Sequence, residues 1–251
     1  MKTLIVANWK MNPSTKKEAK KLFDSVRKST KGIKNIEVVI CPPFVYLSLF
    51  SGLKLGAQNV FYLSADRQVK KSGAFTGEVS PLMLKDLGVE YVIIGHSESR
   101  KYLNETDEVI NKKIKESLLI GLKPILCVGE TDEEKNSGKK LEVLEVQITQ
   151  ALKGVMKSEA KNIVIAYEPV WSIGTGNNCS VDETMSSILL IRKIISKLYN
   201  REIADTTKII YGGSVDSKNT NSYITQTGVN GLLVGGASLN AEEFIEIIKS
   251  L

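Results

Sequence analysis

The sequence lacks the features of disulfide-rich, zinc-binding and membrane-spanning proteins. Its three cysteines, Cys41, Cys127 and Cys179, are an odd number without CxxC spacing, which argues against a disulfide framework and a zinc site. No apolar run approaches the roughly 18 residues that a transmembrane helix needs. The first apolar run ends at Asn8, which is too short for a signal peptide and more typical of a strand. We therefore expect a cytoplasmic protein without a metal site or a membrane partner.

The composition is that of a globular protein. Of the 251 residues, 42% are hydrophobic and 25% are charged, which excludes a disordered or fibrous chain. No linker or shift in composition divides the sequence. We therefore expect a single domain over residues 1–251.

The excess of basic residues has two interpretations. The chain has 34 basic and 28 acidic residues, a net charge of +6, which could attract nucleic acid or anionic substrates. It could equally reflect a solvated, lysine-rich surface. No basic run exceeds a few residues and no aromatic residues are interleaved with one, so we favour the second interpretation and expect no nucleic-acid partner.

Short apolar stretches rich in β-branched residues recur along the chain. Each is continuously hydrophobic, as expected for strands that are covered on both faces. We predict eight strands, at Leu4–Ala7, Ile36–Ile40, Lys54–Ala57, Tyr91–Ile94, Pro124–Val128, Ile163–Ala166, Ile209–Tyr211 and Gly231–Val234.

The segments between these stretches carry helix start signals. Capping boxes, each before a stripe of apolar residues, begin at Thr15 and at Ser180, and Asn240 precedes the last helix. Strands and helices alternating in a chain of this length predict an α/β fold, a single (β/α)8 barrel. A doubly wound open sheet is the alternative, but no GxGxxG turn follows the first strand.

Enzymes with this fold place their chemistry at the carboxyl ends of the strands. The last two strands end in Gly212-Gly213-Ser214 and Gly235-Gly236. Glycines let backbone N–H groups approach an anion closely, so these two turns predict a phosphate site. Taken singly, each pair could simply form a tight turn.

Three ionisable residues also follow predicted strands. His96, the only histidine in the chain, comes directly after the fourth strand, where it can touch a substrate. Glu168 follows the sixth strand and is a candidate general base, because a water-poor pocket can raise the pKa of a carboxylate. Lys10 supplies a positive charge after the first strand. The alternatives are a structural histidine, a salt bridge at the barrel mouth for Glu168, and a pairing of Lys10 with Glu98.

The segment from Pro169 to Gly176 has the composition of a lid. It begins with a stiff proline, continues with the apolar Val170, Trp171 and Ile173, and ends in Gly-Thr-Gly. An apolar tip on a surface loop is costly unless it covers something. We therefore predict a lid with a hinge at each end.

Seven motifs in one order resemble triosephosphate isomerase. They run from Asn8 to Leu239 and so cover nearly the whole chain: Asn8-Trp9-Lys10-Met11-Asn12, Gly56-Ala57-Gln58-Asn59, Gly73-Ala74-Phe75-Thr76-Gly77-Glu78, Gly95-His96-Ser97-Glu98, Tyr167-Glu168-Pro169-Val170-Trp171, Tyr211-Gly212-Gly213-Ser214-Val215 and Leu233-Val234-Gly235-Gly236-Ala237-Ser238-Leu239.

The resemblance implies interconversion of dihydroxyacetone phosphate and D-glyceraldehyde 3-phosphate through an enediolate, without a cofactor or a metal. Glu168 would move the carbon-bound proton, and neutral His96 would polarise the carbonyl. Lys10 and Asn8 would stabilise the oxyanion. The backbone N–H groups that would hold the phosphate are those of Gly174, Ser214, Gly235 and Gly236.

The family also implies a homodimer, in which the loop after the third strand reaches the partner beside Asn8 and Lys10. Some positions depart from the family pattern. Ser99 replaces the usual arginine, and Ser172 and Asn177 replace a common alanine and a frequent lysine. The loop after the third strand is about twice as long as expected, with the extra residues within Phe61–Lys71. These departures concern the subunit contact more than the chemistry.

Two other functions are compatible with parts of the sequence. Another phosphate-binding barrel enzyme, such as an epimerase, would not explain His96, Glu168 and the lid together. A catalytically silent barrel that binds phosphate or nucleic acid would not explain why Lys10, His96 and Glu168 are all present.

Overall fold

A computed structural model describes residues 2–62, 72–174 and 178–251. Eight parallel strands form a closed barrel in the order of the sequence, and β8 pairs with β1. They are β1 Thr3–Asn8, β2 Ile36–Cys41, β3 Lys54–Ala57, β4 Val89–Ile94, β5 Lys123–Val128, β6 Val164–Tyr167, β7 Lys208–Tyr211 and β8 Gly231–Val234. The predicted (β/α)8 barrel is confirmed, with strand ends shifted by one or two residues.

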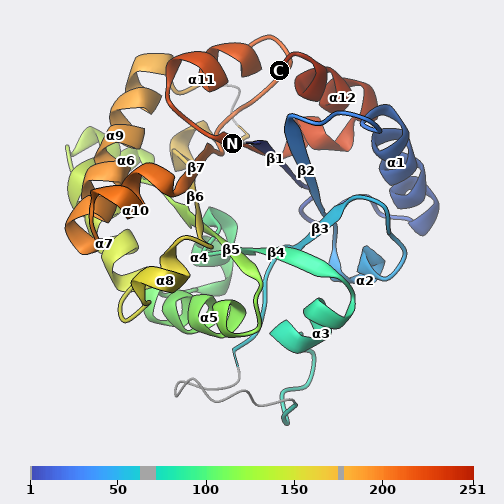
Figure 1. Cartoon of the computed structure of the whole chain (residues 1–251), viewed down its shortest axis with the longest axis horizontal. Helices are drawn as coiled ribbons and strands as arrows, with labels where there is room; N and C mark the ends of the chain where they lie inside the picture. Colours follow the sequence, from blue (N-terminus) through green and yellow to red (C-terminus); the bar gives the residue numbers. More distant parts are fainter. Residues whose placement is uncertain (1, 63–71, 175–177) are drawn as a thin grey trace.

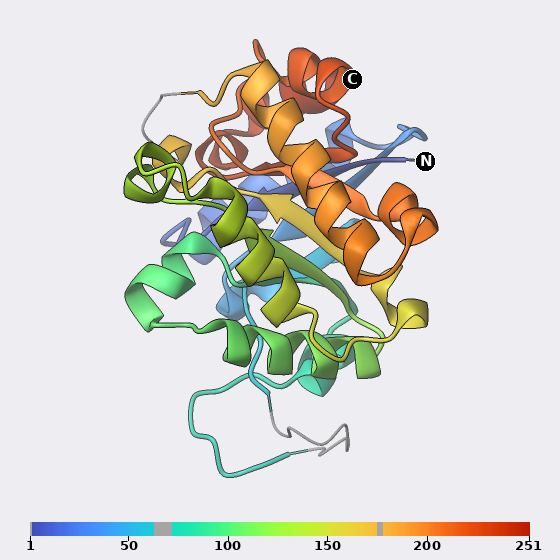
Figure 2. The same ribbon diagram turned by 90° about the vertical axis from the view of Figure 1, so that its left-hand side faces the viewer.

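Helices surround the barrel as an outer ring (Figure 1 and Figure 2). They are α1 Lys16–Ser29, α2 Phe44–Leu47, α3 Pro81–Asp86, α4 Ser97–Leu103, α5 Asp107–Leu119, α6 Asp132–Asn136, α7 Lys140–Ala151, α8 Lys157–Ala160, α9 Val181–Leu198, α10 Arg201–Thr206, α11 Thr220–Gln226 and α12 Ala241–Lys249, with 3₁₀ turns η1 Val170–Ser172 and η2 Gly236–Leu239. Among the described residues, no helix is both long enough and apolar enough to cross a membrane.

Two hydrophobic cores explain why the strands are apolar without alternation. In β1, Leu4 and Val6 point into the barrel, while Ile5 and Ala7 pack against the helices. The other strands except β3 divide their side chains in the same way, and in β3 Leu55 and Ala57 pack against the helices while Gly56 has no side chain. Both faces of each strand are therefore removed from water, as the sequence pattern requires.

The helix starts agree with the predicted caps in all but one detail. Thr15 and Glu18 form a complete capping box at α1, and Asn240 caps α12. Ser180 accepts a hydrogen bond from the Glu183 N–H, but the Glu183 carboxylate pairs with Lys135 and Lys140 instead of completing the box. The predicted second box is therefore only half formed.

Charged side chains surround the amino-terminal end of the barrel. Tyr91 donates a hydrogen bond of 2.5 Å to Glu37, and Lys54 lies 3.3 Å from the same carboxylate. Burial opposes ionisation of Glu37, but these two partners outweigh it and lower the pKa of the carboxyl group. The candidate site lies at the opposite end of the barrel, where the strands have their carboxyl ends.

Candidate active site

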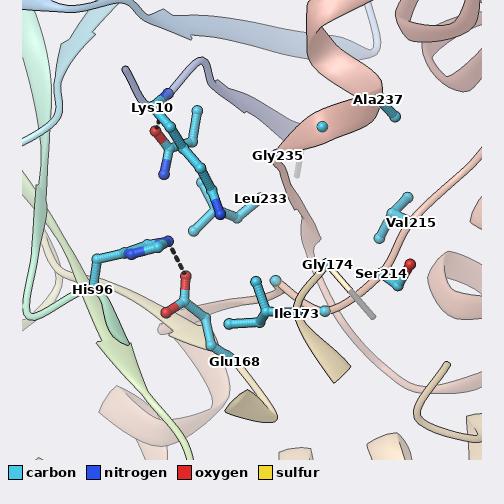
Figure 3. A pocket seen from close by; sticks show the side chains of 14 residues that line it. Lys10, His96, Glu168, Ile173, Gly174, Ser214, Val215, Leu233, Gly235 and Ala237 are labelled. Carbon is cyan, nitrogen blue, oxygen red and sulfur yellow. Dashed lines mark hydrogen bonds and ion pairs between the residues drawn. The ribbon is translucent and has the colours of Figure 1, made fainter. Parts of the chain in front are cut away.

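The carboxyl ends of the strands surround a cavity of about 150 Å³ (Figure 3). All eight residues that the sequence predicted for the site line this cavity: Asn8, Lys10, His96, Glu168, Gly174, Ser214, Gly235 and Gly236. They come from the ends of β1, β4, β6, β7 and β8 and from the predicted lid. The fold therefore brings together residues that are far apart in the sequence.

Lys10 is held in place by its backbone as well as by its side chain. Its φ is +53°, in the left-handed region that few non-glycine residues adopt. The Lys10 N–H donates to Oδ1 of Asn8 at 3.0 Å, and Gln58 donates to the Lys10 carbonyl at 2.8 Å. The Lys10 ammonium lies 2.7 Å from Oε1 of Glu98, so the pairing given above as the alternative for Lys10 is present, in a residue that also lines the cavity. Strain of this kind is typical of functional sites.

The hydrogen bonds of His96 fix its tautomer. Nδ1 accepts the Glu98 N–H at 3.2 Å, at the amino terminus of α4. A nitrogen that accepts a backbone N–H carries no proton, so the ring proton of the neutral imidazole lies on Nε2. Nε2 points into the cavity toward Glu168, whose Oε1 is 3.3 Å away (Figure 3).

Glu168 is only 2% exposed and lies where β6 ends. Its other carboxylate oxygen, Oε2, accepts the Ser97 N–H at 3.3 Å. Two glycines leave room for it: a Cβ on Gly129 would lie 1.8 Å from the Glu168 carbonyl oxygen, and one on Gly212 would lie 2.9 Å from its Cγ. The position of this carboxylate thus depends on the absence of two side chains.

A buried thiol lies beneath the carboxylate. Burial and the neighbouring Glu168 raise the pKa of Cys127 well above its ordinary value. The thiol is therefore neutral and adds no negative charge next to Glu168.

The glycine-rich side of the cavity offers backbone N–H groups. Gly174, Ser214 and Gly235 lie opposite His96 across the cavity (Figure 3). Gly236, where η2 begins, also lines the cavity. The Ser214 N–H donates to Oγ of Ser172 at 3.3 Å. The four residues of this rim carry no charged side chain and Lys10 lies beside Gly235, so an anionic group fits at the rim. The Glu168 carboxylate lines another part of the same cavity.

The predicted lid begins with an anchored segment. The indole Nε1 of Trp171 donates to Oε1 of Glu130 at 3.1 Å, and the Tyr167 hydroxyl donates to the same carboxylate at 3.0 Å. The Lys135 ammonium lies over the Trp171 ring, 3.3 Å from its centre. Val170 and Trp171 are half-buried, so the apolar tip is covered more than its sequence suggested.

Glu130 is the main residue whose role the sequence did not reveal. It is fully buried. Burial of the Tyr167 phenol raises the pKa of that group, and the nearby charge of Glu130 raises it further. The position of Glu130 directly after β5 was the available signal, since the other site residues also follow strands. Two expectations lie outside the described residues. They are most of the lengthened loop, at residues 63–71, and the second hinge of the lid with Asn177, at residues 175–177.

Within residues 2–62, 72–174 and 178–251, no group of three or more His, Cys, Asp or Glu side chains could hold a metal ion. The polar side chains that line the cavity are the Glu168 carboxylate, the His96 imidazole, the Lys10 ammonium group, the Asn8 amide and the Ser214 hydroxyl, beside a glycine-rich rim. This set can move protons and stabilise negative charge on oxygen.

Comparisons with known proteins agree with this chemistry. The family model described as triosephosphate isomerase matches residues 3–251. The chain is 47% identical to the triosephosphate isomerase of Dictyoglomus thermophilum over 253 positions, covering 98% of each chain. It is 46% identical to that of Carboxydothermus hydrogenoformans, covering 99% of this chain and 98% of the other. It is 45% identical to that of a Thermoanaerobacter species, covering 98% of each.

Proposed function

The chain belongs to the triosephosphate isomerase family, and from this membership we propose how its site interconverts dihydroxyacetone phosphate and D-glyceraldehyde 3-phosphate. The observation that carries the proposal is the convergence of Glu168, His96 and Lys10 on one cavity whose opposite rim is a row of backbone N–H groups. The first three groups suit proton transfer beside a carbonyl, and the rim suits a phosphate.

Glu168 acts as the general base. Its carboxylate removes a proton from C1 of dihydroxyacetone phosphate, and the electron pair of that C–H bond moves to form an enediolate. Glu168 then returns the proton to C2, which produces the aldehyde. Its position supports this role, because the carboxylate lies in the lining of the cavity, within reach of a bound substrate.

His96 and Lys10 stabilise the negative charge that develops on oxygen. With its proton on Nε2, His96 donates a hydrogen bond to the substrate carbonyl and shuttles a proton between the two enediolate oxygens. Lys10, supported by Asn8, contributes a fixed positive charge in the same cavity. In the described state His96 and Glu168 contact each other, so the substrate must enter between them.

The phosphate is held by the backbone N–H groups of Gly174, Ser214, Gly235 and Gly236. Because the Ser214 N–H already donates to Ser172, phosphate binding exchanges one acceptor for another. The segment anchored at Trp171 then covers the site, which excludes water from the enediolate.

The test is a coupled isomerase assay on the purified chain in both directions. We expect turnover without any added cofactor or metal. A correctly folded chain without turnover, as judged by circular dichroism, would contradict the proposal.

We further propose that the chain forms a homodimer and acts in the cytoplasm as one barrel domain, residues 1–251. Large apolar side chains are exposed after four consecutive strands: Met11 (92%), Val45 (75%), Phe75 and Tyr102. The ends of β1 to β4 are neighbours in the barrel, so these residues share one flank that a second copy would cover. All three cysteines are buried thiols, which suits a reducing compartment.

Sedimentation at micromolar concentrations tests the dimer. Dimerisation should be lost in a Met11→Glu, Val45→Glu variant and kept in a Leu189→Glu variant, since Leu189 is exposed on α9, away from these loops. A fully active wild-type monomer would refute the proposed dimer.

A further inference from the structure

The net positive charge of the chain is concentrated in residues 16–34, which form α1 and the turn after it. Eight of the 34 basic residues and two of the 28 acidic residues lie there, which leaves 26 of each in the rest of the chain. This segment therefore carries +6, equal to the net charge of the whole protein. A generally lysine-rich surface would spread the excess over many elements.

The basic side chains of this segment all face solvent. Ala19, Leu22, Phe23 and Val26 are the buried residues of α1 and pack against the barrel. The basic residues, which we call the α1 basic surface, are exposed: Lys16, Lys17, Lys20, Lys21, Arg27, Lys28, Lys31 and Lys34. With α1 at 14 residues, the helix is about 20 Å long, so the charges form a strip rather than a single point.

Very little in the described parts of the chain neutralises this strip. Arg27 pairs with Asp24 at 3.0 Å, and Glu18 is occupied in the capping box with Thr15. Within the described residues, none of the seven lysines has a carboxylate within ion-pair distance. Residues 42–53 on the α2 side contain no charged residue. On the other side, exposed Glu242 and Glu246 of α12, which packs beside α1, limit the strip (Figure 1).

The surface at this strip is also hollowed. The charged residues that line a hollow of about 510 Å³ are Arg27, Lys28 and Lys31. Those of a second hollow, of about 260 Å³, are Lys20, Arg27 and Asp24, the last being the ion-pair partner of Arg27. Cationic side chains around a recess approach an anion from more than one direction. Both hollows are remote from the candidate active site and share no lining residue with it.

The character of the strip distinguishes between classes of polyanion. Membrane-binding helices insert an apolar face, but the apolar face of α1 is buried in the protein. Single-stranded nucleic acid is bound on aromatic stacking platforms, and the only aromatic residue of α1, Phe23, is buried. Protein interfaces are depleted of lysine at their centres. A regular row of phosphates needs only exposed cations.

We propose that the α1 basic surface binds the phosphate backbone of double-stranded nucleic acid without sequence preference. The sequence alone favoured a solvated surface because it contains no long basic run. The helix changes this interpretation, since residues spaced by three or four positions become neighbours on one side. The proposal is independent of the isomerase activity.

The test is fluorescence anisotropy of a labelled, mixed-sequence DNA duplex titrated with the full chain. At about 50 mM KCl we expect a dissociation constant on the order of 10⁻⁵ M or below, weakening linearly on a double logarithmic plot as KCl rises. The affinity should fall by about tenfold or more in a variant with Lys20→Gln, Lys21→Gln, Lys28→Gln and Lys31→Gln. The slope of the logarithm of the binding constant against the logarithm of the KCl concentration should become smaller in magnitude by about 3 to 4.

A control variant removes the same charge elsewhere: Lys139→Gln, Lys153→Gln, Lys157→Gln, Lys161→Gln. These four lysines are exposed and have no ion pair among the described residues. The control should bind the duplex within about twofold of wild type, since specific phosphate contacts and not net charge set the affinity. Both variants should keep isomerase activity, which shows that they are folded.

Three results would overturn the proposal. Equal losses in the two variants would show that only net charge matters. No measurable binding by the wild-type chain at about 50 mM KCl would exclude the site. Stronger binding to anionic lipid vesicles or to a polyglutamate peptide than to the duplex would assign the strip to another class of partner.

Discussion

Replacing Gly212 by alanine should move the catalytic base without touching it chemically. A Cβ at this position would lie 2.9 Å from Cγ of Glu168, whereas ordinary contact begins at 3.4 Å. The Glu168 side chain must therefore retreat by roughly half an ångström. Since misplacement by about 1 Å costs on the order of 10²-fold in rate, we expect kcat to fall by about tenfold.

The effect on stability should be small. The crowded contact costs about 1 to 3 kcal/mol, and the loss of backbone freedom in the unfolded chain offsets about 0.4 to 1 kcal/mol of it. Thermal unfolding followed by circular dichroism measures this difference, and steady-state kinetics measures kcat and KM separately.

Gly236→Ala is the matched control on the same cavity. A Cβ there has no atom within 4 Å, and alanine keeps the backbone N–H group that we propose binds the phosphate. We expect any change in this variant to appear in KM rather than in kcat. A wild-type kcat for Gly212→Ala would show that the absence of a side chain at position 212 does not position Glu168.

Three further predictions concern the lid, the charged end of the barrel and a buried ion pair. Saturation with a phosphate-bearing substrate analogue should change the emission of Trp171, measured with Trp9→Phe to remove the second tryptophan, and an unchanged spectrum would contradict the lid. The partners of Glu37 lower its pKa below the ordinary value of 4.5, so ionised Glu37 stabilises the fold above pH 4.5 and this stabilisation is lost as the pH falls further. The Tm of Glu37→Gln should therefore fall less steeply than that of the wild type as the pH is lowered below 4.5. Lys113→Met leaves the buried carboxylate of Glu105 without its cation and should lower the free energy of unfolding, measured in urea, by about 3 to 5 kcal/mol. Adding Glu105→Gln should restore most of this stability, and equal stability of the single and double variants would contradict the prediction.

The sequence was most informative where packing imposes a simple pattern. Strands such as β1 were predictable because their side chains are buried on both faces, so that Leu4 to Ala7 are all apolar. The cavity residues were predictable because a parallel barrel collects the carboxyl ends of its strands at one end. Both inferences depend only on position along the chain.

Contacts between side chains of distant elements were not predictable in this way. Nothing in the order of residues indicates that Glu130 accepts hydrogen bonds from both Trp171 and Tyr167, or that Glu183 turns away from its own cap toward two lysines. The excess of basic residues in 16–34 can be counted in the sequence, but only the helix shows that they lie together on its exposed side, opposite the buried Ala19, Leu22, Phe23 and Val26.

The central claim is that Glu168 moves a carbon-bound proton of the substrate. Deuterium incorporation at C1 of dihydroxyacetone phosphate, followed by proton NMR in D₂O, measures that step directly. We expect the wild-type chain to exchange this proton during turnover. We expect Glu168→Gln, in which an amide cannot accept the proton, to slow the exchange by several orders of magnitude while remaining folded. Exchange by Glu168→Gln at near the wild-type rate would contradict the account.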